Sequence, residues 1–218
     1  MPASAREPPT RSDRNSFTSR PSTPRVFRYV VKHTGFAPCF NNGICTLACC
    51  KPSVRRSAVV GDWILGFAPR SKGDARLVYA IRVGEVLDFR SYAQDPRFGQ
   101  RLDNIYQPDG GGRYCRVAAR DIHASPREQE RDLSGRHVLI ADQWWYFQDE
   151  GRDLRFELGE EIAYRLWYSG RGHKVSGLRP GDLEALLAIL GHAGGTSNAM
   201  RSTVECGSKS QLRGQCRD

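Results

Sequence analysis

The sequence predicts an α+β domain built on a curled antiparallel β-sheet, with short flanking helices and one helix near the carboxyl end. Several runs are rich in β-branched and aromatic residues, and two of them flank a turn-forming segment, as in a hairpin. The strands do not alternate with helices, as they would in a parallel βαβ fold. The chain has 218 residues, which is enough for one domain with a hydrophobic core.

The expected strands are recognised by their content of valine, isoleucine and aromatic residues. They lie at residues 26–31, 62–67, 76–87, 137–141 and 144–147. The segment between the second and the third of them is rich in glycine, proline and serine. It therefore predicts a hairpin with a basic tip.

Helices are expected at three places: residues 44–50, 89–95 and 179–190. The first should end at Lys51, because a residue that precedes a proline avoids the helical conformation. Asp182 can cap the third helix and Gly191 can end it. Residues 162–167 fit either a helix or a strand.

The two ends of the chain differ in composition from its centre. Residues 1–24 and 191–218 are polar and lack hydrophobic periodicity, so we expect a disordered basic tail, a domain at 25–190 and a second disordered tail. No apolar run approaches the roughly 20 residues that span a membrane. The amino end has no apolar segment of the kind found in secretion signals, so a cytoplasmic protein is expected. Seven cysteines at irregular spacing then predict free thiols rather than a disulfide framework.

The net charge of +9 is distributed over the whole chain. Each predicted tail supplies +2, which leaves +5 on the central domain. A basic domain favours polyanionic partners, so DNA, RNA or a nucleotide is the expected ligand. Arginine outnumbers lysine, which suits bidentate binding of phosphate. A genome rich in G and C would produce the same bias.

Four cysteines lie close together in the most informative segment, residues 35–66. A zinc site is one interpretation of this cluster. Zinc sites usually use two pairs of closely spaced ligands, however, and only one such pair occurs here, so no metal is expected. Cys45 lies near an expected helix start and Cys50 precedes a lysine; both are candidate nucleophiles, because nearby positive charge activates a thiol. Packing of small apolar side chains in a turn is the alternative.

Lys51, Arg55 and Arg56 form a basic group directly after these cysteines. Guanidinium and ammonium groups bind phosphate oxygens, so the three residues are candidate phosphate ligands. A solvent-exposed charged surface would explain them equally simply.

A base-binding surface is predicted from aromatic and amide side chains. Trp63 or Trp144 is expected to stack on a base, and Asp103 with Asn104 to hydrogen-bond to its edge, beside Tyr106. The alternatives are core packing for the aromatic residues and a local turn for Asp103.

Acid–base chemistry has two candidate sources in the sequence. Asp103 would act as the acid or base if the protein were an enzyme with a cysteine nucleophile. Asp121 and His123, with one residue between them, offer a carboxylate and an imidazole, although this spacing alone is not specific. The chain contains no Walker loop, dinucleotide fingerprint or serine nucleophile elbow.

A series of short motifs runs in order through the predicted domain: Tyr29-Val30-Val31-Lys32, Gly35-Phe36-Ala37-Pro38, Cys45-Thr46-Leu47-Ala48, Cys50-Lys51-Pro52, Arg55-Arg56, Gly61-Asp62-Trp63-Ile64, Leu77-Val78-Tyr79-Ala80, Asp95-Pro96-Arg97-Phe98 and Asp103-Asn104-Ile105-Tyr106. This series resembles the bacterial and phage "nucleotide modification associated domain", second type, over residues 26–190. Cys45 and Cys50 match positions of that family, whereas Cys39 and Cys49 do not. The resemblance implies an association with systems that make or handle modified bases in DNA.

A second resemblance concerns architecture. Gly61-Asp62 before a hydrophobic strand, followed by a basic hairpin and a returning strand with Val83 and Val86, is similar to PUA-like barrels of the ASCH and EVE kind. This similarity implies a small PUA-like β-barrel whose mouth accepts a nucleobase. Fold similarity alone does not establish function.

Three functional hypotheses follow. The first is a module that binds nucleic acid or a nucleotide, and recognises a modified or flipped-out base in a DNA-modification or phage-conflict system. The second is an enzyme that acts on a nucleotide or modified base through a cysteine nucleophile. The third is a structural or partner-binding protein of a toxin or defence cassette, in which Lys51, Arg55 and Arg56 are only solvated surface. None of the three requires a cofactor, and the sequence leaves protein partners open.

Overall fold

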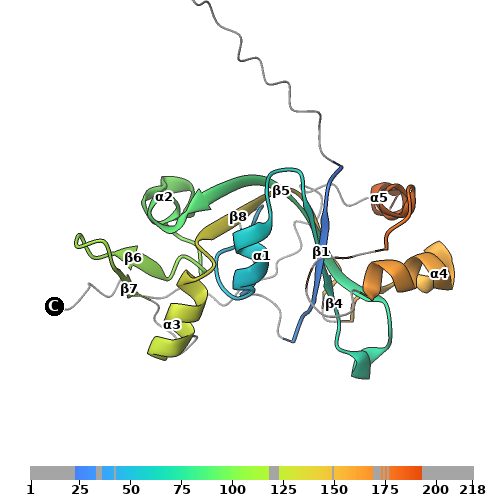
Figure 1. Cartoon of the computed structure of the whole chain (residues 1–218), viewed down its shortest axis with the longest axis horizontal. Helices are drawn as coiled ribbons and strands as arrows, with labels where there is room; N and C mark the ends of the chain where they lie inside the picture. Colours follow the sequence, from blue (N-terminus) through green and yellow to red (C-terminus); the bar gives the residue numbers. More distant parts are fainter. Residues whose placement is uncertain are drawn as a thin grey trace, which may run out of the picture.

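A computed structural model describes residues 23–32, 36–41, 43–117, 123–148, 150–168, 173, 175 and 177–192 (Figure 1). The chain forms the mixed α+β fold that the sequence predicts. The two expected tails lie almost entirely outside the described residues. Among the described residues, no helix has the length and apolar character that a membrane crossing requires.

Seven strands form the main sheet. In spatial order, six of them are β1 (Val26–Val30), β4 (Trp63–Phe67), β5 (Arg76–Asp88), β8 (His137–Tyr146), β3 (Ile44–Leu47) and β2 (Cys39–Asn41); the short β9 (Arg152–Asp153) also pairs with β5. All pairs are antiparallel except β1 with β4, which is parallel. The sheet is therefore antiparallel at every pair but one.

The sheet is curled but open. Tyr29 on one edge strand and Phe40 on the other both contact the ring of Tyr79, with ring centroids 5.7 and 5.8 Å apart. Within the described residues, β1 and β2 are nevertheless the two ends of the hydrogen-bonded path and do not pair with each other. The closed PUA-like barrel is therefore not formed.

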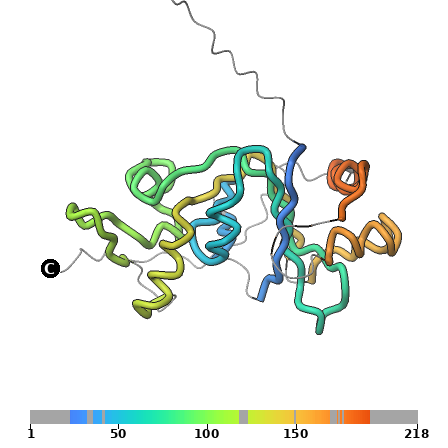
Figure 2. The backbone as a smooth tube through the Cα atoms, in the orientation of Figure 1, coloured from blue at the N-terminus to red at the C-terminus, as the bar shows by residue number. Residues whose placement is uncertain are grey.

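Among the described residues, five α-helices, two 3-10 turns and a small hairpin surround the sheet. They are α1 (Pro52–Ser57), η1 (Arg70–Lys72), α2 (Phe89–Gln94), η2 (Pro96–Phe98), β6 (Tyr106–Pro108), β7 (Tyr114–Arg116), α3 (Pro126–Leu133), α4 (Arg155–Trp167) and α5 (Asp182–His192). β5 runs from the η1 turn to α2 and connects the two ends of the molecule (Figure 2). α3 and the β6–β7 hairpin lie at one end, and α4 and α5 at the other (Figure 1).

Apolar side chains pack on both faces of the sheet. On one face, Trp63, Leu65 and Leu77 pack against α4 and α5. On the other face, Tyr79 and Val54 belong to a cluster that joins the inner side of the curl to α1. A third cluster lies under α2 and the β6–β7 hairpin. The strand predictions rested on residues of these clusters, which explains why those strands were located correctly.

Two local predictions need correction, and one open alternative is settled. The helix expected at 44–50 is wrong: β3 occupies Ile44–Leu47, between β2 and β8, and the helix begins instead at Pro52. Proline favours the first helical turn because it needs no N–H partner there and its φ is already helical. The two strands expected at 137–141 and 144–147 are one strand, and the ambiguous segment 162–167 is helical.

Cysteine chemistry follows the prediction with one exception. Cys39, Cys45, Cys49 and Cys50 are free thiols. Cys115 is disulfide-bonded, which corrects the expectation that the chain holds thiols alone.

Candidate functional site

Cys50 occupies a strained turn between β3 and α1. Its backbone φ is +59°, and that of Lys51, the residue before the helix, is +45°. Left-handed backbone at a residue other than glycine costs about 1–3 kcal/mol and persists only where the surroundings hold it. Such positions gather at functional sites, and here the turn leaves the Cys50 side chain partly exposed.

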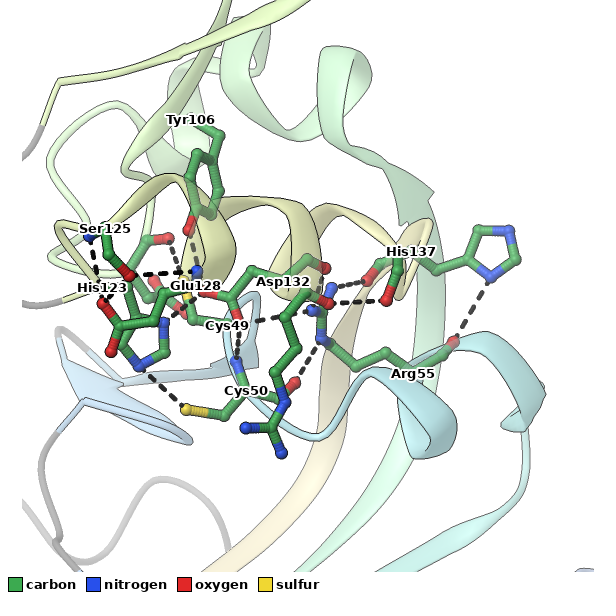
Figure 3. Close-up of polar contacts among 12 residues, drawn as sticks. Cys49, Cys50, Arg55, Tyr106, His123, Ser125, Glu128, Asp132 and His137 are labelled. Atoms are coloured by element: carbon green, nitrogen blue, oxygen red, sulfur yellow. Dashed lines mark hydrogen bonds and ion pairs between the residues drawn. The ribbon is translucent and has the colours of Figure 1, made fainter.

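The imidazole of His123 lies between the thiol of Cys50 and the carboxylate of Asp132 (Figure 3). Its Nε2 atom is 3.3 Å from the Sγ atom of Cys50, and its Nδ1 atom makes a short contact with Oδ2 of Asp132. Each ring nitrogen therefore has a different partner. A thiol, an imidazole and a carboxylate in this order are the parts of an activated cysteine nucleophile, with a base and a group that orients the base.

Asp132 also holds the nucleophile turn in place. Its Oδ1 atom accepts the backbone N–H of Cys50 at 2.8 Å, and its Oδ2 atom accepts the hydroxyl of Tyr106 at 2.9 Å. α3 carries Asp132 in its last turn, and begins with a capping box between Ser125 and Glu128 that fixes its start. One buried carboxylate thus positions both the base and the thiol.

Arg55 is buried beneath this turn rather than exposed to a ligand. Its guanidinium group donates to three backbone carbonyls, those of Cys50, Asp132 and His137. The Cα of Gly135 lies so close that a Cβ there would be 2.5 Å from the guanidinium carbon. Arg55 therefore joins α1, α3 and β8 around the site, and is not placed to contact a phosphate, which corrects its predicted role.

The charges of the site stabilise one another. The hydrogen bond to Asp132, assisted by the one to Cys50, raises the pKa of His123 to about 10. Burial raises the pKa of Asp132, but the hydrogen bonds from His123, the Cys50 amide and Tyr106 outweigh it and leave that pKa below its ordinary value. At neutral pH the pair is therefore an imidazolium beside a carboxylate.

Cys50, His123 and Asp132 are also the one group among the described residues whose spacing suits a metal ion. Cys50 and Asp132 contact opposite nitrogens of the ring, however, so an ion on one nitrogen would break a contact on that side. The arrangement fits proton transfer better than metal coordination.

Two of the three predicted phosphate ligands keep exposed surface near this site. Lys51 follows Cys50, and its Nζ atom donates to the carbonyl of Val30 at 3.4 Å. Burial lowers the pKa of Lys51, and the charges of Arg131 and Lys32 lower it further, while Cys50 raises it. Arg56 is exposed on α1 and donates to the carbonyl of Ser134. Of the predicted phosphate ligands, Lys51 and Arg56 thus remain accessible.

The other enzymatic candidates lie apart from the relay. Cys45 is fully buried, and burial raises its pKa, so it is not placed to act as a nucleophile. Asp103 is 1% exposed and accepts hydrogen bonds from Thr46, Tyr92 and Arg101. It closes a buried polar network, and does not face Cys50 as an acid or base would have to.

The predicted base-binding residues do not converge. Trp63 is buried and stacks on Trp145, on the α4 and α5 side of the sheet, whereas Trp144 packs on the opposite face. Asn104 donates to the carbonyl of Phe98. Tyr106 alone reaches the site, where it bonds to the carboxylate and is itself buried.

The sequence named two of the three relay residues but not their partnership. Cys50 was a candidate nucleophile, and His123 was paired with Asp121, which lies outside the described residues. Asp132 was not singled out. The signal that was present is the capping box followed by an aspartate in the last turn of the same helix, but only the folded chain shows where that aspartate points.

Comparison with known proteins gives one match. No curated protein and no solved structure matches the chain. Residues 23–200, most of the chain and all of the site, match a family model described as nucleotide modification associated domain 2. The protein therefore belongs to the nucleotide modification associated domain 2 family.

Proposed function

We propose that this protein is an enzyme that acts on a nucleotide or a nucleic-acid base through nucleophilic attack by Cys50. The observation that carries the proposal is the continuous contact from the Cys50 thiol through His123 to Asp132. A domain that only binds its ligand has no need to hold a cysteine in strained backbone against a base.

The geometry assigns a role to each group. His123 holds the proton of the thiol while the Cys50 sulfur forms a bond to an electrophilic carbon of the substrate. The bond from that carbon to the leaving group breaks, and the departing group keeps the electron pair and takes the proton from His123. Water or a second acceptor then displaces the sulfur and restores the thiol. Asp132 keeps the imidazole oriented throughout.

The nature of the substrate is inferred from family and charge. The description of the family names an association with nucleotide modification. Lys32, Lys51 and Arg131 place positive charge beside Cys50, and the whole chain carries +9. An anionic substrate such as a nucleotide, DNA or RNA suits both observations.

Alkylation of the native protein tests the nucleophile. Iodoacetamide should modify Cys50 rapidly at neutral pH, as read by mass spectrometry of its peptides, while the buried Cys45 and Cys49 stay unmodified. The variant Cys50→Ser should show no rapid modification. Uniformly slow alkylation of all thiols in the folded protein would rule the proposal out.

A second candidate is a module that binds nucleic acid or a nucleotide without catalysis. The exposed Arg56 and the cations around Lys51 favour it. Single-turnover assays of wild type and Cys50→Ala on labelled oligonucleotides and nucleotides separate the two functions. Chemical change that depends on Cys50 indicates the enzyme, and salt-dependent binding without change in either protein indicates the module.

A further inference from the structure

Three cations lie on separate segments that meet at the Cys50 turn. Lys32 follows the end of β1, Lys51 precedes α1, and Arg131 lies on α3 directly before Asp132. Lys32 and Arg131 are exposed, and Lys51 is partly exposed. Lys32 lies two residues after Val30, whose carbonyl accepts a hydrogen bond from Lys51. Arg131 directly precedes Asp132, which accepts the backbone N–H of Cys50, so the segments that carry the three cations meet at the Cys50 turn.

The position of Lys51 is fixed by its backbone and by two contacts. Its left-handed φ turns the side chain back towards β1, where the ammonium group lies 4.3 Å from the centre of the Tyr29 ring and donates to the carbonyl of Val30. An ammonium group has three N–H donors. One is used by Val30, so two remain for a ligand.

Acidic residues do not neutralise this group of cations. Among the described residues, none of the three makes an ion pair with a carboxylate. Asp132 is occupied by His123 and the Cys50 amide, and Glu128 by Ser125 at the helix cap. Most other arginines near the surface are paired, for example Arg97 with Glu85 and Arg165 with Asp182. Unpaired like charges repel, and an anion among them removes the repulsion.

We propose that Lys32, Lys51 and Arg131 form a subsite for a phosphate group of the substrate, next to the Cys50 sulfur. The inference rests on the proposed function and adds to it that the reacting molecule is phosphorylated, either as a free nucleotide or within a single strand of DNA. The subsite holds the phosphate so that the attached nucleoside lies over the thiol. Arg55, which the sequence placed in a phosphate site, is beneath it and takes no part.

Protection against alkylation, together with calorimetry, tests the subsite. The alkylation rate of Cys50 is measured with iodoacetamide in the presence of thymidine, thymidine 5′-monophosphate, inorganic phosphate or a ten-residue oligothymidylate. The monophosphate or the oligomer should protect at a concentration lower than that of thymidine by about tenfold or more, since charge-assisted phosphate contacts are worth that much. Protection by the monophosphate indicates a free nucleotide, and protection by the oligomer alone indicates the DNA backbone.

A double variant and a matched control assign the effect to these residues. Lys32→Ala with Arg131→Ala should weaken calorimetric binding of the protecting ligand by about tenfold or more. The control, Arg70→Ala with Arg179→Ala, removes two exposed cations on the α4 side and should leave it unchanged.

The outcomes separate the subsite from the function. Equal protection by thymidine and its phosphate, with rapid alkylation of Cys50, overturns the subsite and leaves the nucleophile standing. Slow alkylation overturns the nucleophile, while calorimetry with the monophosphate still tests the subsite. If the two double variants weaken binding equally, the subsite is also overturned, since the net positive charge of the protein would then explain the binding.

Discussion

The carboxylate of Asp132 accepts the backbone N–H of Cys50 at 2.8 Å, across 82 positions of the sequence. The same carboxylate orients His123, so the thiol and its base share one anchor. A displacement of α3 would move both partners together. This makes the distance between sulfur and imidazole less sensitive to motions of the sheet than contacts from two separate segments would be.

Removal of the base should slow the reaction of the thiol. In His123→Gln, alkylation of Cys50 by iodoacetamide at neutral pH should fall by about tenfold or more, because the thiolate is the reactive species and glutamine supplies no positive charge to stabilise it. Rates from stopped reactions and peptide mass spectrometry give the comparison. His173→Gln, a change in a histidine whose imidazole lies 3.3 Å from the carbonyl of Arg28, should react like wild type. Equal rates for all three proteins would contradict the relay.

The pair of His123 and Asp132 should make stability depend on pH. The pKa of His123 rises from 6.5 to about 10, so its contribution to the free energy of unfolding is complete below pH 6.5 and is lost as the pH rises through 10. The lowered pKa of Asp132 adds stability above its ordinary value of 3.8 that is lost on acidification. Melting temperatures of wild type should therefore fall between pH 7 and 10 more steeply than those of His123→Gln. Parallel curves would show that the pair does not titrate in this way.

Replacement of Arg55 by lysine tests the buried guanidinium. Lysine keeps the charge but cannot reach the carbonyls of Cys50, Asp132 and His137 together. The free energy of unfolding should fall by about 3 kcal/mol or more, as for other broken buried ionic contacts. Arg56→Lys, on the exposed face of the same helix, should change it by less than about 0.5 kcal/mol. Urea denaturation measures both, and similar values for the two would refute the structural role.

Gly135 should be intolerant of a side chain. A Cβ there would lie 2.5 Å from the guanidinium carbon of Arg55, so Gly135→Ala should destabilise the fold by about 1–3 kcal/mol through overpacking. It should also slow alkylation of Cys50, since Arg55 holds that turn. Gly191→Ala, where nothing lies within 4 Å, should be neutral or slightly stabilising. An unchanged free energy of unfolding in Gly135→Ala would mean that the Arg55 side chain can adopt another conformation.

Asp103 should matter for folding and not for reactivity. Asp103→Asn removes the carboxylate that pairs with the buried Arg101 and should cost about 3 kcal/mol of stability. The folded variant should alkylate at Cys50 at the wild-type rate. A large drop in that rate, at a temperature where the variant is folded, would restore Asp103 as the acid or base.

The sequence predicted the parts of the fold that depend on apolar pattern. β1, β4 and β5 were located because their residues pack in the two large clusters on either face of the sheet. β3 was predicted as a helix because a strand of only four residues is too short to show the alternation of apolar and polar side chains. Its strand conformation depends on pairing with β2 and β8. Openness of the sheet is likewise a property of pairing between distant segments.

The sequence predicted those site residues whose chemical neighbours lie close to them in the sequence. Cys50 was named because a lysine follows it directly. Arg55 was misassigned because sequence position alone cannot tell a guanidinium that faces solvent from one that faces three backbone carbonyls. Asp132 was missed because its partners, Cys50 and Tyr106, are 82 and 26 positions away.

Because Asp132 holds both Cys50 and His123, the site can form only after Asp132 has been synthesised. The ribosome makes the cysteine long before the aspartate, so a growing chain carries its thiol without base or anchor. Under the proposed function, the thiol is activated only when the later segment has been made and folds against the earlier one. Truncated or nascent chains would then lack an activated thiol.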